Sequence, residues 1–288
     1  GIYFDDEITT DAKVNILDNV IYANLDRRDG VAGNGIHFDN EVNSNAKIEI
    51  GDGSGGSEDS GGSNVISGFN GIVFADDIFN SADIEIDGNR IGFTADAFTG
   101  PYDNNRLSGN GIQFSKIYDN AEIEIADTHI RASADGIQFD GDVYGKANIL
   151  IGGKAGDKNT INALNNGIEF NKDVYQNAIV EISHNDIDST RSGIRFEGDV
   201  SNVASPGIRQ DEILIAHNDI DIYGDGSGIQ FVGTVSDNRH DTRIEKNDIL
   251  VRDGFRENGD DAVEFQGYID DASIWIVNND RLYGNRDG

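Results

Sequence analysis

The sequence predicts an all-β solenoid, a chain wound into successive coils that stack on one another. Three observations lead to this fold class: a tetrapeptide that recurs, short segments in which apolar and polar residues alternate, and no sustained helical stripe. The tetrapeptide Gly-Ile-x-Phe, with one degenerate copy, returns at intervals of 25 to 40 residues. Such internal similarity indicates a repeat architecture. The copies begin at Gly1, Gly35, Gly71, Gly111, Gly136, Gly167, Gly193, Gly228 and Ala262.

Each unit continues with the same chemistry after its tetrapeptide. A β-branched residue follows seven positions after the first residue, except in the fourth unit, where Ile117 comes one residue early. An alternating run then follows, as in Ala12-x-Val14-x-Ile16 and Ala46-x-Ile48-x-Ile50. The other β-branched residues are Ile8, Val42, Ile78, Val143, Val174, Val200, Val235 and Ile269.

The third segment of each unit begins near an Asn, which usually stands three residues after the last Ile of the run. Asn89, Asn185, Asn218 and Asn247 occupy this position, each with an Ile two residues further on. We expect this Asn column to lie at a left-handed bend, with side-chain amides hydrogen-bonded from coil to coil. Each unit therefore contains three short strands. A propeller blade needs four strands in roughly 40 residues, which the shortest units cannot hold.

In a coil of this kind, equivalent residues of successive turns lie about 4.8 Å apart. The phenylalanines of the tetrapeptides should therefore form one interior column beside a column of Ile. Stacked rings of this sort add about 0.5–1.5 kcal/mol per pair beyond their burial. The predicted column contains Phe4, Phe38, Phe74, Phe114, Phe139, Phe170, Phe196, Phe231 and Phe265.

These repeats resemble right-handed parallel β-helices, the pectate-lyase-like superfold, and most of all the solenoid segments of large bacterial surface proteins. The resemblance covers essentially all 288 residues. It implies a single domain, residues 1–288, built as a right-handed, single-stranded parallel β-helix of about nine coils with three short strands per coil. Because lyases, epimerases, tailspikes and adhesins share this fold, the resemblance does not select one function.

The composition of the chain limits the classes of binding partner and predicts its location. The net charge of −31 argues against nucleic acid, whose phosphates require a basic surface. No apolar run approaches 18 residues, so we expect no membrane insertion within this segment. An acidic, Asp-rich and Lys-poor solenoid is typical of secreted or salt-exposed proteins, which predicts an extracellular or cell-surface location, whereas the absence of Cys says nothing about the compartment. The two ends, joined, would read as one further repeat, so we expect a window of a longer array or a subunit that stacks end to end.

Two groups of acids are candidate Ca²⁺ ligands. One group stands six residues after the start of a unit, and the other occupies the outward position of the second strand in three consecutive coils. Like charges one coil apart repel each other, and a cation with six to eight oxygen ligands could relieve the repulsion. A solvated acidic face is the alternative. The first group is Glu7, Glu41, Asp77, Asp142, Asp173 and Asp199, and the second is Glu49, Glu85 and Glu124.

The outward residues of the first strand are candidates for contact with a glycan. They form a polar row in the middle of the chain: Gln113, Gln138, Glu169, Arg195 and Gln230. The neighbours Glu169 and Arg195 could equally form a cross-strand ion pair. The Asn-Thr-Asp, Gly-His-Gly and Asp-Pro-His signatures of related enzymes are absent. Each polar residue also looks like a member of a repeating column, whereas an active site should break the repeat, so we favour a role without catalysis.

Two further features are weaker candidates. His184 and His217 hold equivalent positions in adjacent units, with Lys246 in the next, which predicts a charged sheet edge rather than a metal site. Insertions before the first strand contain Phe93, Phe98, Tyr102 and Phe255, which could contact sugar rings or pack over the loops.

The predicted role is a rigid stalk or adhesive unit at the cell surface, with Ca²⁺ as a candidate stabilising ion and glycans or other surface proteins as partners. Two alternatives stay open. One is a domain that binds a polysaccharide, or cleaves or epimerises it, and the other is a subunit that assembles end to end into filaments or a surface layer.

Overall fold

The computed structural model describes residues 1–23, 33–51, 64–92, 107–153, 158–175, 177–202, 213–237, 241–252 and 261–284. Within these ranges the chain forms strands and short turns, and it contains no helix. No helix of the described chain is therefore long and apolar enough to cross a membrane.

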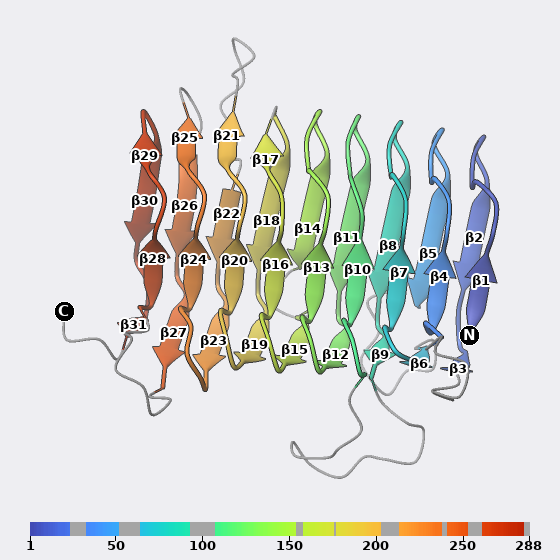
Figure 1. The fold of residues 1–288 in the computed structure, drawn as a ribbon, viewed down its shortest axis with the longest axis horizontal. Coiled ribbons are helices and arrows are strands. Elements are labelled where there is room, and N and C mark those ends of the chain that lie inside the picture. The colour runs from blue at the N-terminus through green and yellow to red at the C-terminus, as the bar shows by residue number, and fades with distance from the viewer. Residues whose placement is uncertain are drawn as a thin grey trace.

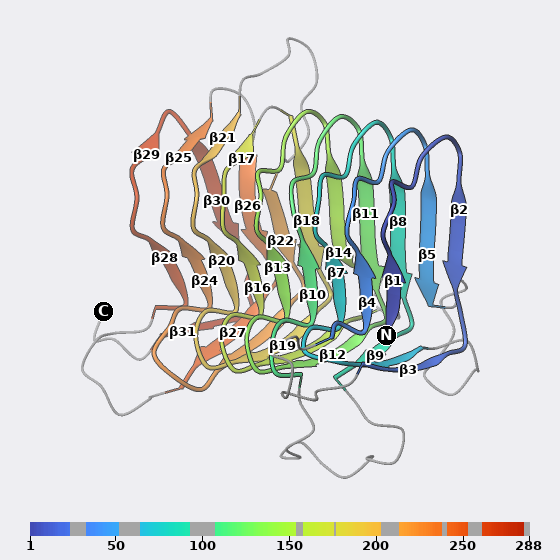
Figure 2. The ribbon, with the colours of Figure 1, turned by 45° about the vertical axis from the view of Figure 1, so that its right-hand side comes forward.

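The described strands form three long parallel sheets, one on each side of a coil, with nine strands in each sheet. Figure 1 shows the coils side by side from the N-terminal to the C-terminal end, and Figure 2 shows the three sides in an oblique view. The first sheet contains β1 (Ile2–Phe4), β4 (Ile36–Phe38), β7 (Ile72–Phe74), β10 (Ile112–Phe114), β13 (Ile137–Phe139), β16 (Ile168–Phe170), β20 (Ile194–Phe196), β24 (Ile229–Phe231) and β28 (Val263–Phe265).

The second sheet holds the alternating run that follows Ala in most units. It contains β2 (Lys13–Ile16), β5 (Lys47–Gly51), β8 (Asp83–Asp87), β11 (Glu122–Ala126), β14 (Asn148–Gly152), β18 (Ile179–Ser183), β22 (Ile213–Ala216), β26 (Asp241–Glu245) and β30 (Ser273–Val277). The third sheet follows the Asn position of each unit. It contains β3 (Val20–Tyr22), β6 (Val65–Ser67), β9 (Arg90–Ile91), β12 (His129–Ala132), β15 (Thr160–Ala163), β19 (Asp186–Ser189), β23 (Asp219–Ile222), β27 (Asp248–Val251) and β31 (Arg281–Tyr283).

The predicted architecture is thus confirmed as a three-sided parallel β-helix of about nine coils. The β-branched column adds a fourth, narrower ladder at the corner between the first and second sheets. Single bridges join it from Ile8 to Val174, and a four-stranded sheet continues it. Ile117 pairs with Val143 although it comes one residue early in its unit, so the register of this ladder is kept in the following coil. The strands of the fourth sheet are β17 (Val174–Tyr175), β21 (Val200–Asn202), β25 (Val235–Asp237) and β29 (Ile269–Asp270).

The phenylalanine column is present as predicted. All nine rings stack in a continuous line, with centroid separations from 4.4 to 5.2 Å and interplanar angles of at most 11°. The seven inner rings are at most 1% exposed, while Phe4 and Phe265 are only half-buried. Because the sheets impose the same spacing on every coil, one residue type at one repeat position fills the interior from layer to layer.

The Asn column forms a hydrogen-bonded ladder, as predicted, but the predicted left-handed bend lies one residue earlier. Asn185 shows why. Its Nδ2 group donates to the carbonyl of Ile151 in the preceding coil, at 2.9 Å, and to Oδ1 of Asn218 in the following coil, at 2.9 Å. This buried Asn faces inward, and the residue before it, His184, takes the left-handed conformation with φ of 57°.

Candidate functional site

The predicted glycan-contacting row lies on the outer face of the first sheet, and its members are neighbours. Gln113 pairs in register with Gln138, Gln138 with Glu169, Glu169 with Arg195, and Arg195 with Gln230. These residues occupy the central positions of β10, β13, β16, β20 and β24. The sequence therefore placed the row correctly, while its binding to a glycan stays a prediction.

Glu169 differs from the rest of this row because it is buried, with 6% of its surface exposed. Its carboxyl group accepts hydrogen bonds from Asn166 Nδ2, at 2.8 Å, and from Gln138 Nε2, at 3.4 Å. The Arg195 guanidinium lies 3.6 Å from it, so the predicted cross-strand ion pair is present. Arg195 also pairs with Glu197 at 2.6 Å, and it therefore divides its charge between two carboxylates.

A second buried acid, Asp135, lies against Glu169. Asp135 lies two residues before the start of β13 and is 3% exposed. Its Oδ1 atom accepts the backbone N–H of Asn166, at 2.8 Å, and Asn165 Nδ2, at 2.6 Å. Its other oxygen accepts Gln138 Nε2 at 3.3 Å, so a single amide donates to both buried carboxyl groups.

Asp135 was not among the predicted site residues, although the repeat carried a signal for it. The residue directly before the tetrapeptide is Asn in the two preceding units and in the one that follows, whereas later units hold Ser192, Ser227 and Asp261. In the structure, the side-chain oxygen at this position accepts the backbone N–H of the next coil, as in the 3.1 Å contact from Asp135 N to Asn110 Oδ1. Asp135 thus places a buried carboxylate between the amides of Asn110 and Asn166, a local break in the repeat of the kind that a functional site should show.

Burial changes the proton affinity of both acids. It raises the pKa of Glu169 to about 7; the nearby Asp135 charge acts in the same direction, and Arg195 opposes it. Burial also raises the pKa of Asp135, while hydrogen bonds from Asn166 and Asn165 partly offset this effect. The charged form of a buried carboxyl group is disfavoured because it loses its contact with water.

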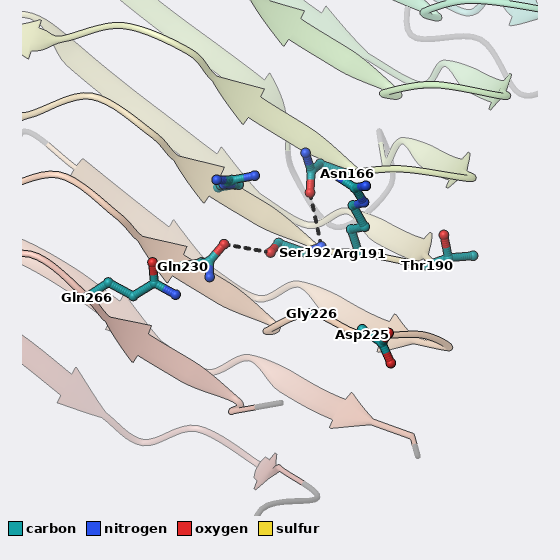
Figure 3. A pocket seen from close by; sticks show the side chains of 9 residues that line it. Asn166, Thr190, Arg191, Ser192, Asp225, Gly226, Gln230 and Gln266 are labelled. Atoms are coloured by element: carbon teal, nitrogen blue, oxygen red, sulfur yellow. Dashed lines mark hydrogen bonds between the residues drawn. The ribbon is translucent and has the colours of Figure 1, made fainter. Parts of the chain in front are cut away.

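A polar pocket of about 420 Å³ opens beside this pair, over the C-terminal half of the first sheet and the adjoining turns. Figure 3 shows the side chains that line it. Ser192 lies at its centre: its backbone N–H donates to Asn166 Oδ1, at 3.1 Å, and its hydroxyl donates to Gln230 Oε1, at 3.0 Å. Arg195 and Gln230, both from the predicted row, line the pocket together with Arg191. Amide, hydroxyl and guanidinium groups thus converge on one hollow.

The first acid group lies at the corner before the fourth ladder, and several of its members bond to the next coil. Asp142 Oδ1 accepts the N–H of Asp173 at 3.3 Å, Asp173 Oδ1 accepts that of Asp199 at 2.8 Å, and Asp199 Oδ1 accepts that of Thr234 at 2.7 Å. These carboxylates therefore take part in the architecture, a role that the sequence analysis did not foresee. The remaining members, Glu7, Glu41 and Asp77, hold the equivalent position in the first three coils.

The second acid group forms a true row. Glu49 pairs in register with Glu85, and Glu85 with Glu124. Lys47 Nζ lies 3.3 Å from Glu85 and 3.3 Å from Asp83, which compensates part of the negative charge. Across the described ranges, no three His, Cys, Asp or Glu side chains gather around one point that could hold a metal ion. The acids form rows one coil apart, not a cage, and Ca²⁺ binding stays a prediction.

The histidines stack as neighbours, with the ring centroids of His184 and His217 at 4.6 Å. Both residues, and Lys246 in the next coil, have positive φ and stand at the corner between the second and third sheets. Burial lowers the pKa of His217, and the charges of His184 and Lys246 lower it further. The loop aromatics Phe93, Phe98, Tyr102 and Phe255 lie outside the described residues.

No protein-family model matches the chain, and no curated protein or solved structure matches it. The structure shows the parallel β-helix architecture, while membership of the pectate-lyase-like group stays a prediction.

Proposed function

We propose that this chain is a rigid structural element of a secreted or cell-surface protein, in which the β-helix acts as a spacer. The observation that carries the proposal is the continuity of its side-chain columns. The Phe stack, the Asn ladder and three of the ladders of paired strands each run from the first coil to the last among the described residues, with Thr128 in place of Asn in one coil of the Asn ladder.

This continuity gives the rod its stiffness for a physical reason. Bending the rod would have to separate strands, stacked rings and buried amides on the same side at once. Nine coils at a spacing of about 4.8 Å give a rod of roughly 40 Å. The high negative charge keeps such rods soluble and apart from one another.

Location tests this proposal directly. Antibodies raised against the folded chain should label intact cells of the source organism or its culture medium. Labelling only after permeabilisation would contradict the proposed location.

The stiffness of the rod is tested by pulling the chain from its two ends in optical tweezers. A spacer should resist extension and then unfold in steps of about one or more coils. Gradual extension at low force would contradict the rigid rod.

Glycan binding on the first sheet is a second candidate, and the pocket favours it. Sugars expose many hydroxyl groups, and this pocket presents amide and guanidinium groups from Asn166, Arg195 and Gln230, with the Ser192 hydroxyl. Glycans would thus bind across neighbouring coils of the outer face, as the row predicts.

Saturation-transfer NMR with a panel of neutral and acidic oligosaccharides tests this candidate. Gln230→Ala should weaken any binding observed, because Gln230 lines the pocket. Gln113→Ala is the matched control, since Gln113 belongs to the same row but bonds to Asp140 outside the pocket. Equal effects of the two substitutions, or no binding by any sugar, would remove this candidate.

A further inference from the structure

The Asp135–Glu169 pair stands where the neighbouring coils on its N-terminal side use neutral amides, whereas later coils place Ser192, Ser227 and Asp261 in one column and Glu264 in the other. Asn70, Asn110 and Asn166 occupy the position of Asp135 in neighbouring coils, and Gln113 and Gln138 precede Glu169 in its row. An amide oxygen accepts the N–H of the next coil as well as a carboxylate does. The architecture alone therefore gives no reason for two acids here, and each acid carries a cost of burial that an amide would avoid.

The geometry places the two carboxyl groups against one donor. Both are buried, Asp135 at 3% and Glu169 at 6% exposed, and they come from adjacent coils. Two ionised carboxylates in this arrangement repel each other, and only a protonated carboxyl group could donate a hydrogen bond. Gln138 Nε2 donates to both groups, at 3.3 and 3.4 Å, which keeps their remaining oxygens together.

The charges around the pair favour the same state. Arg195 is the cation that the described residues place against Glu169, and Glu197 competes for it at the shorter distance of 2.6 Å. The other groups that contact the pair, Asn165, Asn166 and Gln138, are neutral. Without a bound proton, the ionised carboxyl groups of Asp135, Glu169 and Glu197 would share the single Arg195 guanidinium. Two of these three carboxyl groups, those of Asp135 and Glu169, are buried. A proton removes one of these charges at the site where hydration is weakest.

We propose that Asp135 and Glu169 form a proton-binding site, in which two buried carboxyl groups of adjacent coils hold one proton between them and release it when the pH is raised. After release, the two buried carboxylates repel each other. Arg195 is then attracted more strongly toward Glu169, and the Asn166 amide faces a full carboxylate. Because Arg195 and Asn166 line the pocket, proton release also changes the donors presented at its wall.

The sign of the effect on stability follows from the raised pKa values. Glu169 keeps its proton in the folded chain up to a pKa of about 7, whereas the unfolded chain releases it near the ordinary value of 4.5. The stabilisation is complete below about pH 4.5 and is lost as the pH rises to about 7. The raised pKa of Asp135 acts in the same direction.

The primary test is a ¹³C NMR titration of the side-chain carboxyl groups in the wild-type chain. Glu169 or Asp135 should titrate near neutral pH, and the Arg195 Nε resonance should shift over the same range. Titration of both acids near the pKa of solvated carboxyl groups, about 4, would overturn the proposal. This measurement needs no substitution and no ligand, so it stands apart from the proposed glycan binding.

Urea unfolding as a function of pH provides the second test. Glu169→Gln introduces the amide that the row uses elsewhere, and it should flatten the fall in stability between about pH 5 and pH 7. Glu197→Gln is the matched control, because Glu197 contacts the same Arg195 but is exposed. The control should keep the fall. A Glu169→Gln chain that retains the wild-type pH profile would overturn the proposal.

Discussion

The ring of Phe139 lies parallel to that of Phe170, with centroids 4.4 Å apart and planes 3° apart. The two residues are 31 positions apart in the sequence but adjacent in space, because the chain makes one full turn of the β-helix between them. The relationship repeats at every step of the column, so the loss of one ring removes contacts both above and below it.

We expect Phe139→Ala to lower the free energy of unfolding by about 3–5 kcal/mol, since the ring is fully buried and a cavity would remain. Phe4→Ala should cost clearly less, because Phe4 is half-buried and stacks on one side only. Urea unfolding followed by circular dichroism measures both values. Equal losses for the two substitutions would show that the stack contributes little beyond side-chain size.

The Asn ladder gives a second prediction. Asn185→Ala removes the side-chain donor to Ile151 O, while Asn218 Oδ1 keeps the backbone N–H of residue 185, so we expect a cost of about 1–3 kcal/mol for the carbonyl that loses this donor. Asn148→Ala is the control, because its 3.3 Å bond to Glu122 is exposed, and it should change stability by less than about 0.5 kcal/mol. Hydrogen exchange should accelerate around Asn218 in the first variant alone. Unchanged exchange there would argue against a ladder that links the coils.

The sequence predicted the columns well because each one repeats a single residue type at a single position. The stacking of Phe139 can be predicted from the repeat alone, since every coil places a Phe at the same position. Asp135 could not be found in this way. Its importance depends on contact with Glu169, 34 residues further on, and on burial that a row of outward residues does not reveal. The one-residue error at the Asn bend has a similar cause, because the pattern marks a corner but does not say which residue has positive φ.

A third prediction concerns two glycines of one coil, Gly152 and Gly145. Gly152 has a φ of 97°, and a Cβ atom there would overlap the backbone carbonyl of Ser183 in the next coil. Gly152→Ala should therefore destabilise the chain by more than the roughly 1–2 kcal/mol of left-handed backbone alone. Gly145 has a φ of 66°, and a Cβ there would lie 3.1 Å from its nearest neighbour, the N atom of Asp119.

The position equivalent to Gly145 holds Asn80 and Asp119 in preceding coils, both with positive φ. Gly145→Asn should therefore be nearly neutral, since Asn tolerates this region. Thermal melting of both variants provides the comparison. A tolerated Gly152→Ala, or a severe loss for Gly145→Asn, would contradict the coil-to-coil packing described at these two corners.

The row of Glu49, Glu85 and Glu124 makes the Ca²⁺ proposal testable. The carboxylates repel each other across neighbouring strands, so a bound divalent cation should raise the melting temperature, and a chelator should lower it. The combined variant Glu49→Gln, Glu85→Gln and Glu124→Gln should lose most of this dependence.

A variant with Asp5→Asn, Glu197→Gln and Asp270→Asn removes the same number of charges from exposed positions in separate coils. It controls for net charge and should keep the response to Ca²⁺. Melting in calcium chloride, against sodium chloride of equal ionic strength, separates specific binding from screening. A wild-type melting temperature that is the same with and without the chelator would remove Ca²⁺ from the proposed stabilisation of the rod.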